Sequence, residues 1–130
     1  MNLLLDTHTL IWYLEGNLQL SQTCQNLIEN PSNTNFVSIA SFWEIAIKLS
    51  ISGKLELSQP FDQLNRIVWE NNITTLPIRF EHTALVRSLP FYHKDPFDRI
   101  IIAQSILDDM AVLSRDGHFD AYSIRRFWYN

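Results

Sequence analysis

The amino-acid sequence predicts an α/β fold in which a mostly parallel central sheet of four or five strands carries helices on both faces. Three observations support this prediction. Short apolar runs alternate with longer segments in which apolar residues recur every three or four positions. Pairs of helical segments separate successive strands, as in the crossover connections of parallel sheets. Acidic residues follow several of the strands, at the edge where open α/β sheets bind their ligands.

The first half of the chain is predicted to contain two strands and three helices. Leu3-Leu4-Leu5 is a continuous apolar run, which is typical of a central strand buried on both faces. The helix after this strand is expected to end at Gly16-Asn17, because both residues tolerate the left-handed backbone of a helix C-terminus. In chain order, we expect a strand at 3–5, a helix from Thr7 or His8 to about 16, a helix at 21–29, a strand at 35–38 and a helix at 41–50.

The second half is predicted to contain three further helices and two or three strands. Pro96 favours the first turn of a helix, which places Asp98 near a helix N-terminus. The segment 111–113 is too short and too β-branched to extend this helix, and it is predicted to be a buried strand. The buried face of the helix is expected to consist of Ile101, Ile102, Ser105, Ile106 and Met110. In chain order, we expect a helix at 60–69, a strand at 73–76, a helix at 81–89, a helix from 96, a strand at 111–113 and a strand at 124–128.

The composition is that of a folded protein with one domain, covering residues 1–130. The chain is 46% hydrophobic and 18% charged, which is enough for one substantial core. A net charge of −4 argues against nucleic-acid binding through bulk positive charge, although clustered active-site acids lower the net charge by themselves. The single cysteine, Cys24, allows no internal disulfide. No signal peptide or membrane span is apparent, so we expect a cytoplasmic protein without a membrane association.

Four acidic residues are candidates for one site, because each follows a strand or opens the helix after it. They are Asp6, Glu44, Asp98 and Asp116. Four negative charges brought together would repel one another strongly unless a cation were present. Oxygen ligands suit Mg²⁺, or alternatively Mn²⁺, better than zinc. Such a site typically serves phosphoryl transfer, in which the metal orients and activates a water molecule.

Each acid also has a structural alternative. Asp6 could instead cap the helix after it, and Thr7 could take that place or assist Asp6. Glu44 could complete a capping box with Ser41, since the two have the Ser-x-x-Glu spacing. Asp95 could take the role of Asp98, and an aspartate such as Asp116 commonly forms a turn after a strand.

Other sites and folds fit the sequence less well. The chain has only three glycines and no Gly-rich phosphate loop, and it lacks a G-x-S-x-G nucleophile motif. The four histidines show no metal-ligand spacing and are expected at the surface or as caps, with His93 the best candidate for a phosphate contact. A receiver-like signalling domain also has acids at strand ends. It should pair a phosphorylatable aspartate with a lysine at a later strand end, and no such pair stands out.

Four motifs together resemble those of PIN-domain ribonucleases, specifically the VapC-like toxins of type II toxin–antitoxin systems, and the likeness covers nearly the whole chain. The motifs are Leu-Leu-Asp6-Thr7-His8, Ser41-Phe42-Trp43-Glu44-Ile45, the segment from His93 to Gln104 with Asp95-Pro96-Phe97-Asp98-Arg99 in it, and Leu113-Ser114-Arg115-Asp116-Gly117-His118-Phe119. The segment from Asp95 to Gln104 and its distance to Asp116 are the most specific of these features.

The resemblance implies a three-layer PIN fold and a Mg²⁺-dependent endoribonuclease toxin that a cognate antitoxin inhibits. Asp6, Glu44, Asp98 and Asp116 would be the metal-binding acids, and Ser114 would support the acid pocket. The obvious contacts to RNA would be Lys94, Arg99 and Arg115. Such toxins generally form homodimers, for which 127–129 and Phe91-Tyr92 are candidate exposed aromatic surfaces. The alternative is a catalytically silent PIN-like module that binds a protein partner.

Overall fold

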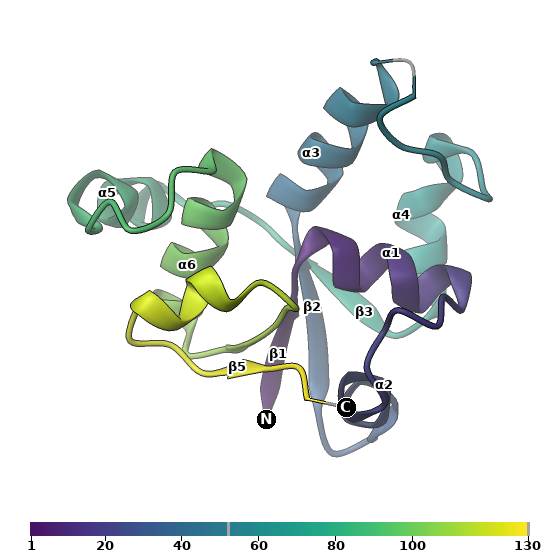
Figure 1. Cartoon of the computed structure of the whole chain (residues 1–130), viewed down its shortest axis with the longest axis horizontal. Helices are drawn as coiled ribbons and strands as arrows, with labels where there is room; N and C mark the ends of the chain where they lie inside the picture. The colour runs from purple at the N-terminus through teal and green to yellow at the C-terminus, as the bar shows by residue number, and fades with distance from the viewer. Residues whose placement is uncertain (52, 130) are drawn as a thin grey trace.

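Five strands form one sheet in the order β3-β2-β1-β4-β5, and every neighbouring pair is parallel (Figure 1). The structure is a computed structural model that describes residues 1–51 and 53–129, and every count of elements refers to these residues. The strands are β1 (Asn2–Leu5), β2 (Thr34–Ser38), β3 (Ile73–Leu76), β4 (Ala111–Leu113) and β5 (Arg126–Phe127). The helices are α1 (Thr7–Glu15), α2 (Gln22–Glu29), α3 (Ile39–Leu49), α4 (Phe61–Glu70), α5 (Phe80–Ser88), α6 (Pro96–Asp108) and the 3₁₀ helix η1 (Gly117–Ala121).

Strand β1 lies at the centre of the sheet, as its run of leucines predicts. Leu4 pairs with Phe36 of β2 on one side and with Val112 of β4 on the other. Leu3, Leu4 and Leu5 are all fully buried. The chain adds β2 and β3 on one side of β1 and then crosses over to add β4 and β5 on the other side. Open α/β sheets bind ligands at the carboxyl ends of strands where the order reverses in this way.

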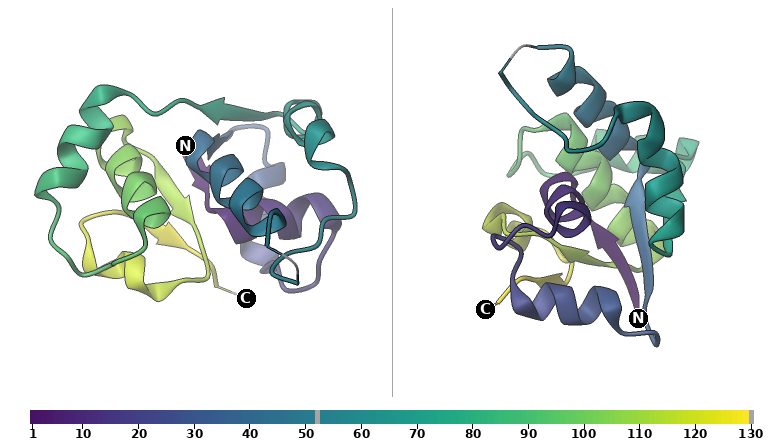
Figure 2. Two further views of the ribbon diagram at one scale, coloured as in Figure 1. Left: turned by 90° about the horizontal axis from the view of Figure 1, so that it is seen from above. Right: turned by 90° about the vertical axis from the view of Figure 1, so that its right-hand side faces the viewer.

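Helices cover both faces of the sheet and make a three-layer fold. Leu3 and Leu5 point to one face and pack in a core with residues of α1, α2, α3 and α4. Leu4 points to the opposite face and packs with residues of α5 and α6. Figures 1 and 2 show α5 and α6 on one side of the strands and α1, α2 and α4 on the other. The predicted α/β class, with a parallel sheet between two helical layers, is confirmed.

Helix α3 begins earlier than the Ser-x-x-Glu pattern predicts. Ser38, the last residue of β2, has an extended backbone, and its hydroxyl accepts the Ala40 N–H at 3.0 Å. Because the strand runs directly into the helix, Ser38 rather than Ser41 is the N-cap. Ser41 lies inside the helix and is fully buried. The predicted capping box is therefore wrong, and Glu44 projects from the second turn without a capping role.

Two further predictions need correction, and both concern the C-terminal third of the chain. Ile106 is 40% exposed, whereas Ile101, Ile102 and Ser105 of the same helix are buried. Met110 is buried as predicted but lies beyond the end of α6. The last strand is shorter than predicted and contains only the two residues of β5. Among the residues that the structure describes, no helix has the length and apolar character that a bilayer crossing needs.

Candidate metal centre

Asp6 lies where β1 passes into α1, and it is 7% exposed. Its Oδ1 accepts the Thr9 N–H at 2.9 Å, so Asp6 rather than Thr7 is the N-cap of this helix. The Ser114 hydroxyl lies near this carboxylate and lowers its pKa, although the larger effect of burial raises it. A carboxylate has acceptor capacity beyond the cap bond, so capping does not prevent Asp6 from binding another group.

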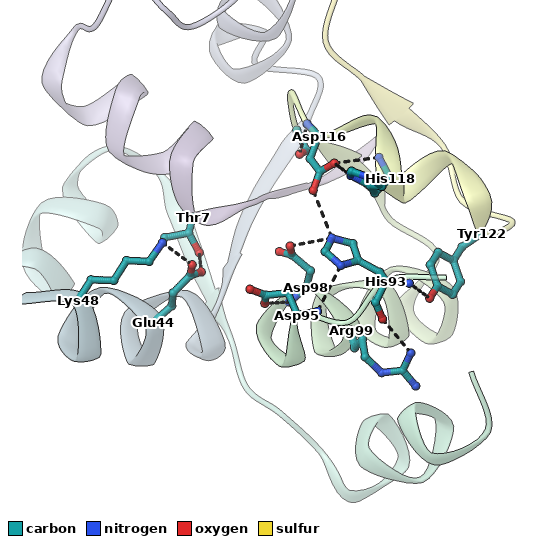
Figure 3. Close-up of polar contacts among 11 residues, drawn as sticks. Thr7, Glu44, Lys48, His93, Asp95, Asp98, Arg99, Asp116, His118 and Tyr122 are labelled. Carbon is teal, nitrogen blue, oxygen red and sulfur yellow. Dashed lines mark hydrogen bonds and ion pairs between the residues drawn. The ribbon is translucent and has the colours of Figure 1, made fainter. Parts of the chain in front are cut away.

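Glu44 is held by two neighbours, one from α1 and one from its own helix (Figure 3). Thr7 Oγ1 lies 2.6 Å from Glu44 Oε1, and Lys48 Nζ lies 2.8 Å from Glu44 Oε2. An ionised carboxylate only accepts, so the Thr7 hydroxyl donates its one hydrogen to Glu44 and accepts a hydrogen bond from the Ser41 hydroxyl, 3.0 Å away. Thr7, which was expected to cap α1 or assist Asp6, thus orients Glu44. Lys48 pairs with the same acid.

Asp98 lies in the first turn of α6, as Pro96 predicts. The neighbouring Asp95 is the N-cap of this helix, and its Oδ1 accepts the Asp98 N–H at 3.0 Å. Asp95 thus caps α6 as Asp6 caps α1, whereas the Asp98 carboxylate reaches the imidazole of His93, with Oδ2 3.0 Å from Nε2. The sequence alone could not show this contact of Asp98.

Asp116 follows β4 and meets the same histidine from the other side. Its Oδ2 lies 3.2 Å from His93 Nε2, and its Oδ1 accepts bonds from the backbone N–H and the Nδ1 of His118. The Asp116 N–H donates to Ser114 Oγ at 2.9 Å. Ser114 is fully buried and lies close to both Asp116 and Asp6, and its support of the acid pocket stays a prediction.

His93 was not expected among the acids, because its sequence position shows no ligand spacing. It lies in the loop before α6, and its ring stands between Asp98 and Asp116 (Figure 3). One atom from each of these three residues lies within 4.8 Å of the others, a grouping that could hold a metal ion. The available signal was its closeness in sequence to Asp95 and Asp98, whereas the neighbouring Lys94 and Arg99 suggested a phosphate contact instead.

The charges of the four acids act on one another, and Asp98 shows this most clearly. Burial raises the pKa of Asp98 to about 8, with the negative charges of Asp95, Asp6, Glu44 and Asp116 adding to the effect. Burial also raises the pKa of Asp6. Burial opposes ionisation of Asp116 as well, but its hydrogen bonds from His118 and His93 prevail and lower its pKa. The site therefore holds more acids than it can keep ionised without a cation.

The donor set of this site fits a hard divalent cation. Asp6, Glu44, Asp98 and Asp116 offer only carboxylate oxygens, the ligands that Mg²⁺ and Mn²⁺ prefer. The structure brings Asp98 and Asp116 together through His93, and Asp6 and Glu44 lie near enough for their charges to act on Asp98. A divalent cation would neutralise the repulsion that raises the pKa of Asp98.

The three basic residues expected to contact RNA differ in where they lie. Lys94 and Arg115 are exposed, and Arg115 reaches the Gln19 side chain at 3.4 Å. Arg99 is only 5% exposed, and its guanidinium donates to the backbone carbonyls of Pro90, His93, Val86 and Leu89. The prediction that Arg99 contacts the substrate therefore needs correction, because its guanidinium is buried and fastens the loop before α6 to α5.

Replacing Arg99 by Met is expected to destabilise the protein by roughly 3 kcal/mol or more. Each buried carbonyl left without a partner costs about 1–3 kcal/mol. Of the four carbonyls that Arg99 serves, Pro90 keeps a bond from Tyr122 and Val86 keeps one from the Leu89 N–H, so the loss comes mainly from those of His93 and Leu89. Urea unfolding measures this loss. The matched change Lys94→Met removes an exposed cation from the same loop and should alter the free energy of unfolding by less than about 0.5 kcal/mol. Equal effects of the two changes would contradict the loop-fastening role of Arg99.

Comparison with known proteins assigns the family. The PIN domain family model matches residues 3–124. The fold is similar to the structure titled "Crystal structure of VapBC2 from Rickettsia felis bound to a DNA fragment from their promoter", with a TM-score of 0.70, 15% identity, and coverage of 98% of this chain and 99% of that one. It is also similar to the "Toxin-antitoxin complex from Klebsiella pneumoniae", with a TM-score of 0.63, 19% identity, and coverage of 95% and 94%.

A third similar structure is the "Crystal Structure of FitAcB from Neisseria gonorrhoeae", with a TM-score of 0.62, 17% identity, and coverage of 96% of each chain. A comparison with curated protein sequences gives no match. The structural likenesses concern the fold, whereas the family model spans nearly all of the sequence, from β1 to the residues before β5. The chain therefore belongs to the PIN domain family.

Proposed function

We propose that this protein is a Mg²⁺-dependent endoribonuclease, with Mn²⁺ as an alternative metal, and that it acts as a VapC-like toxin. The observation that carries the proposal is the buried position of Asp98 among other acids: burial, with the charges of these acids adding to it, raises its pKa to about 8. A protein gains nothing for stability from a carboxyl group that resists ionisation. Such groups are typical of sites where binding or catalysis requires them.

Asp6, Glu44, Asp98 and Asp116 are the residues that would hold the cation. A bound divalent cation supplies a nucleophilic water at neutral pH and offsets the negative charge that develops on the phosphate. The side chains are oriented beforehand by their own partners: Asp6 by the Thr9 N–H, and Glu44 by Thr7 and Lys48. Asp98 would give up its proton to bind a cation, since its pKa is raised to about 8.

The substrate would approach through the exposed cations beside the acids. Lys94 adjoins Asp95, and Arg115 adjoins Asp116, and both side chains are exposed. Two such cations give little binding energy in a chain with a net charge of −4. We therefore expect weak, strongly salt-dependent binding of RNA, and selectivity through the shape of unpaired RNA rather than through charge.

A cognate antitoxin and a second copy of the chain are the proposed protein partners. Two of the similar structures are VapBC2 from Rickettsia felis and a toxin–antitoxin complex from Klebsiella pneumoniae, which supports a partner of this kind. Of the aromatic residues proposed for a dimer surface, Phe91, Tyr92 and Tyr129 are exposed. Phe127 and Trp128 are half-buried against the core, so they contribute less to such a surface than the sequence predicted.

The proposal is tested by following cleavage of a mixed-sequence, unpaired RNA in Mg²⁺, with wild-type protein and with Asp6→Asn. We expect cleavage by the wild type that stops in excess EDTA and returns with Mg²⁺ or Mn²⁺. The variant should retain its fold by circular dichroism, because Asn also caps helices well, and should not cleave. Cleavage that persists in EDTA would refute the metal requirement. A wild type that folds and binds a partner but cleaves no RNA would favour the catalytically silent module.

A further inference from the structure

His93 occupies the space between two of the acids that would hold the metal. Its Nε2 lies 3.0 Å from Asp98 Oδ2 and 3.2 Å from Asp116 Oδ2, so one nitrogen faces both carboxylates. Asp98 comes from α6, and Asp116 follows β4, so the two acids reach the site from separate elements. The imidazole is the side chain that connects them (Figure 3).

The imidazole is held in place from several directions. The backbone N–H of His93 donates to Tyr122 Oη at 3.0 Å, and its carbonyl accepts from Arg99 Nη1 at 3.2 Å. Tyr122 in turn donates to the Pro90 carbonyl at 2.6 Å, which closes the loop. The ring packs against Phe119, with 5.8 Å between the ring centroids, and the side chain is 12% exposed. These contacts restrict both the backbone and the ring of His93, so the fold fixes the direction in which Nε2 points.

The hydrogen bonds of the ring assign its tautomer. The backbone N–H of Asp95 donates to His93 Nδ1 at 3.3 Å, which makes Nδ1 an acceptor. In a neutral imidazole the other nitrogen then carries the hydrogen, so Nε2–H is a donor toward Asp98 and Asp116. A nitrogen that carries a hydrogen has no lone pair for a metal. The arrangement therefore favours a donor to carboxylates over a metal ligand.

We propose that His93 is a positioning residue, whose Nε2–H aligns the carboxylates of Asp98 and Asp116 toward one shared cation. This inference rests on the proposed metal-dependent function of the same site. Two carboxylates that approach each other repel, and a donor placed between them offsets this repulsion and restricts their rotation. Groups that hydrogen-bond to metal ligands in this way typically change metal affinity by 10–100-fold when they are removed.

The test measures Mn²⁺ alone, by the electron paramagnetic resonance signal of the free ion during titration of the metal-free protein. We expect His93→Ala to weaken Mn²⁺ binding by roughly 10–100-fold. His93→Gln should restore most of the affinity, because its side-chain amide places an N–H near the position of Nε2. The comparison variant is His118→Ala, which removes an exposed imidazole that bonds to Asp116 alone and should cause a smaller loss. Circular dichroism and thermal unfolding show whether each variant folds.

The outcomes separate this inference from the function on which it rests. A wild type that binds no Mn²⁺ would overturn the proposed function, and the inference with it. A wild type that binds Mn²⁺ no more tightly than His93→Ala does would overturn only the role of His93. If His93→Ala does not fold, the wild type and His93→Gln decide the question. Electron spin-echo envelope modulation from an imidazole nitrogen bound to Mn²⁺ in the wild type would overturn the donor role of His93. Absence of that modulation, together with near-normal Mn²⁺ affinity of His93→Gln, would support the donor role.

Discussion

Replacing Asp98 by Asn is expected to abolish RNA cleavage and, at the same time, to stabilise the metal-free protein at alkaline pH. The isosteric amide removes one of the proposed metal ligands without changing the shape of the side chain. Losing about 4 kcal/mol of transition-state stabilisation, which is within the range that a metal supplies, lowers the rate about a thousandfold. The same change removes a carboxyl group whose ionisation the fold opposes.

The sign and size of the stability effect follow from the raised pKa. Asp98 titrates near 8 in the folded protein and near its ordinary value of 3.8 when unfolded, so the wild type loses stability as the pH rises from about 4 to 8. A shift of this size corresponds to about 6 kcal/mol, and the 22% exposure of the side chain reduces the expected gain to roughly 2–4 kcal/mol. An asparagine side chain carries no charge, so the variant avoids this loss.

Urea unfolding without metal, at pH 4 and pH 9, measures the difference between the two proteins. They should be nearly equal at pH 4, and Asp98→Asn should be the more stable at pH 9. Asp120→Asn is the matched control, because the pKa of Asp120 is shifted in the opposite direction. Arg126 lowers the pKa of Asp120, so removing this acid should not stabilise the protein. A variant that is inactive because it is unfolded at both pH values would contradict this account of Asp98.

Metal binding is expected to release a proton and to strengthen with pH until about pH 8. At pH 7 most metal-free molecules carry a proton on Asp98, because the pKa of this group is about 8. A cation must displace that proton, so the apparent affinity should rise by about tenfold per pH unit below pH 8 and level off above it. Burial also raises the pKa of Asp6, which adds to the pH dependence.

Calorimetric titration of Mn²⁺ in buffers of different ionisation enthalpy counts the protons released. We expect close to one proton at pH 7 and less than half of one at pH 9 for the wild type. Asp98→Asn should bind the metal far more weakly and lose most of the pH dependence. Metal binding that is independent of pH between 6 and 8 would show that Asp98 does not exchange a proton for the cation.

The fold was predictable from the sequence because its signals are local and strong. The leucine run at 3–5 indicated a central strand, Gly16 has the positive φ of 64° that ends α1, and Pro96 opens α6 as expected. Parallel strands bring their carboxyl ends to one edge, so acids placed after strands meet there whatever the detailed packing. For this reason the general location of Asp6, Asp98 and Asp116 could be predicted.

What the sequence did not show depends on contacts between distant segments. Thr7 bonds to Glu44, 37 positions away, and no local pattern distinguishes this contact from a capping role. The sequence position of Arg99 beside the acids indicated an exposed cation. In the structure, four backbone carbonyls of the segment before it accept hydrogen bonds from its guanidinium, and the side chain is buried. His93 lies close to both carboxylates only because its loop is tied to η1 and α5 through Tyr122 and Arg99. Side-chain partners of this kind follow from the tertiary structure.

The most direct test is a crystal structure of the protein grown with Mn²⁺, with anomalous diffraction data recorded near the manganese edge. The account predicts an anomalous peak at the carboxyl edge of the sheet, bound by oxygens of Asp98 and Asp116 and bordered by Asp6 and Glu44. A map with no peak at that edge, at a Mn²⁺ concentration well above any plausible dissociation constant, would contradict it.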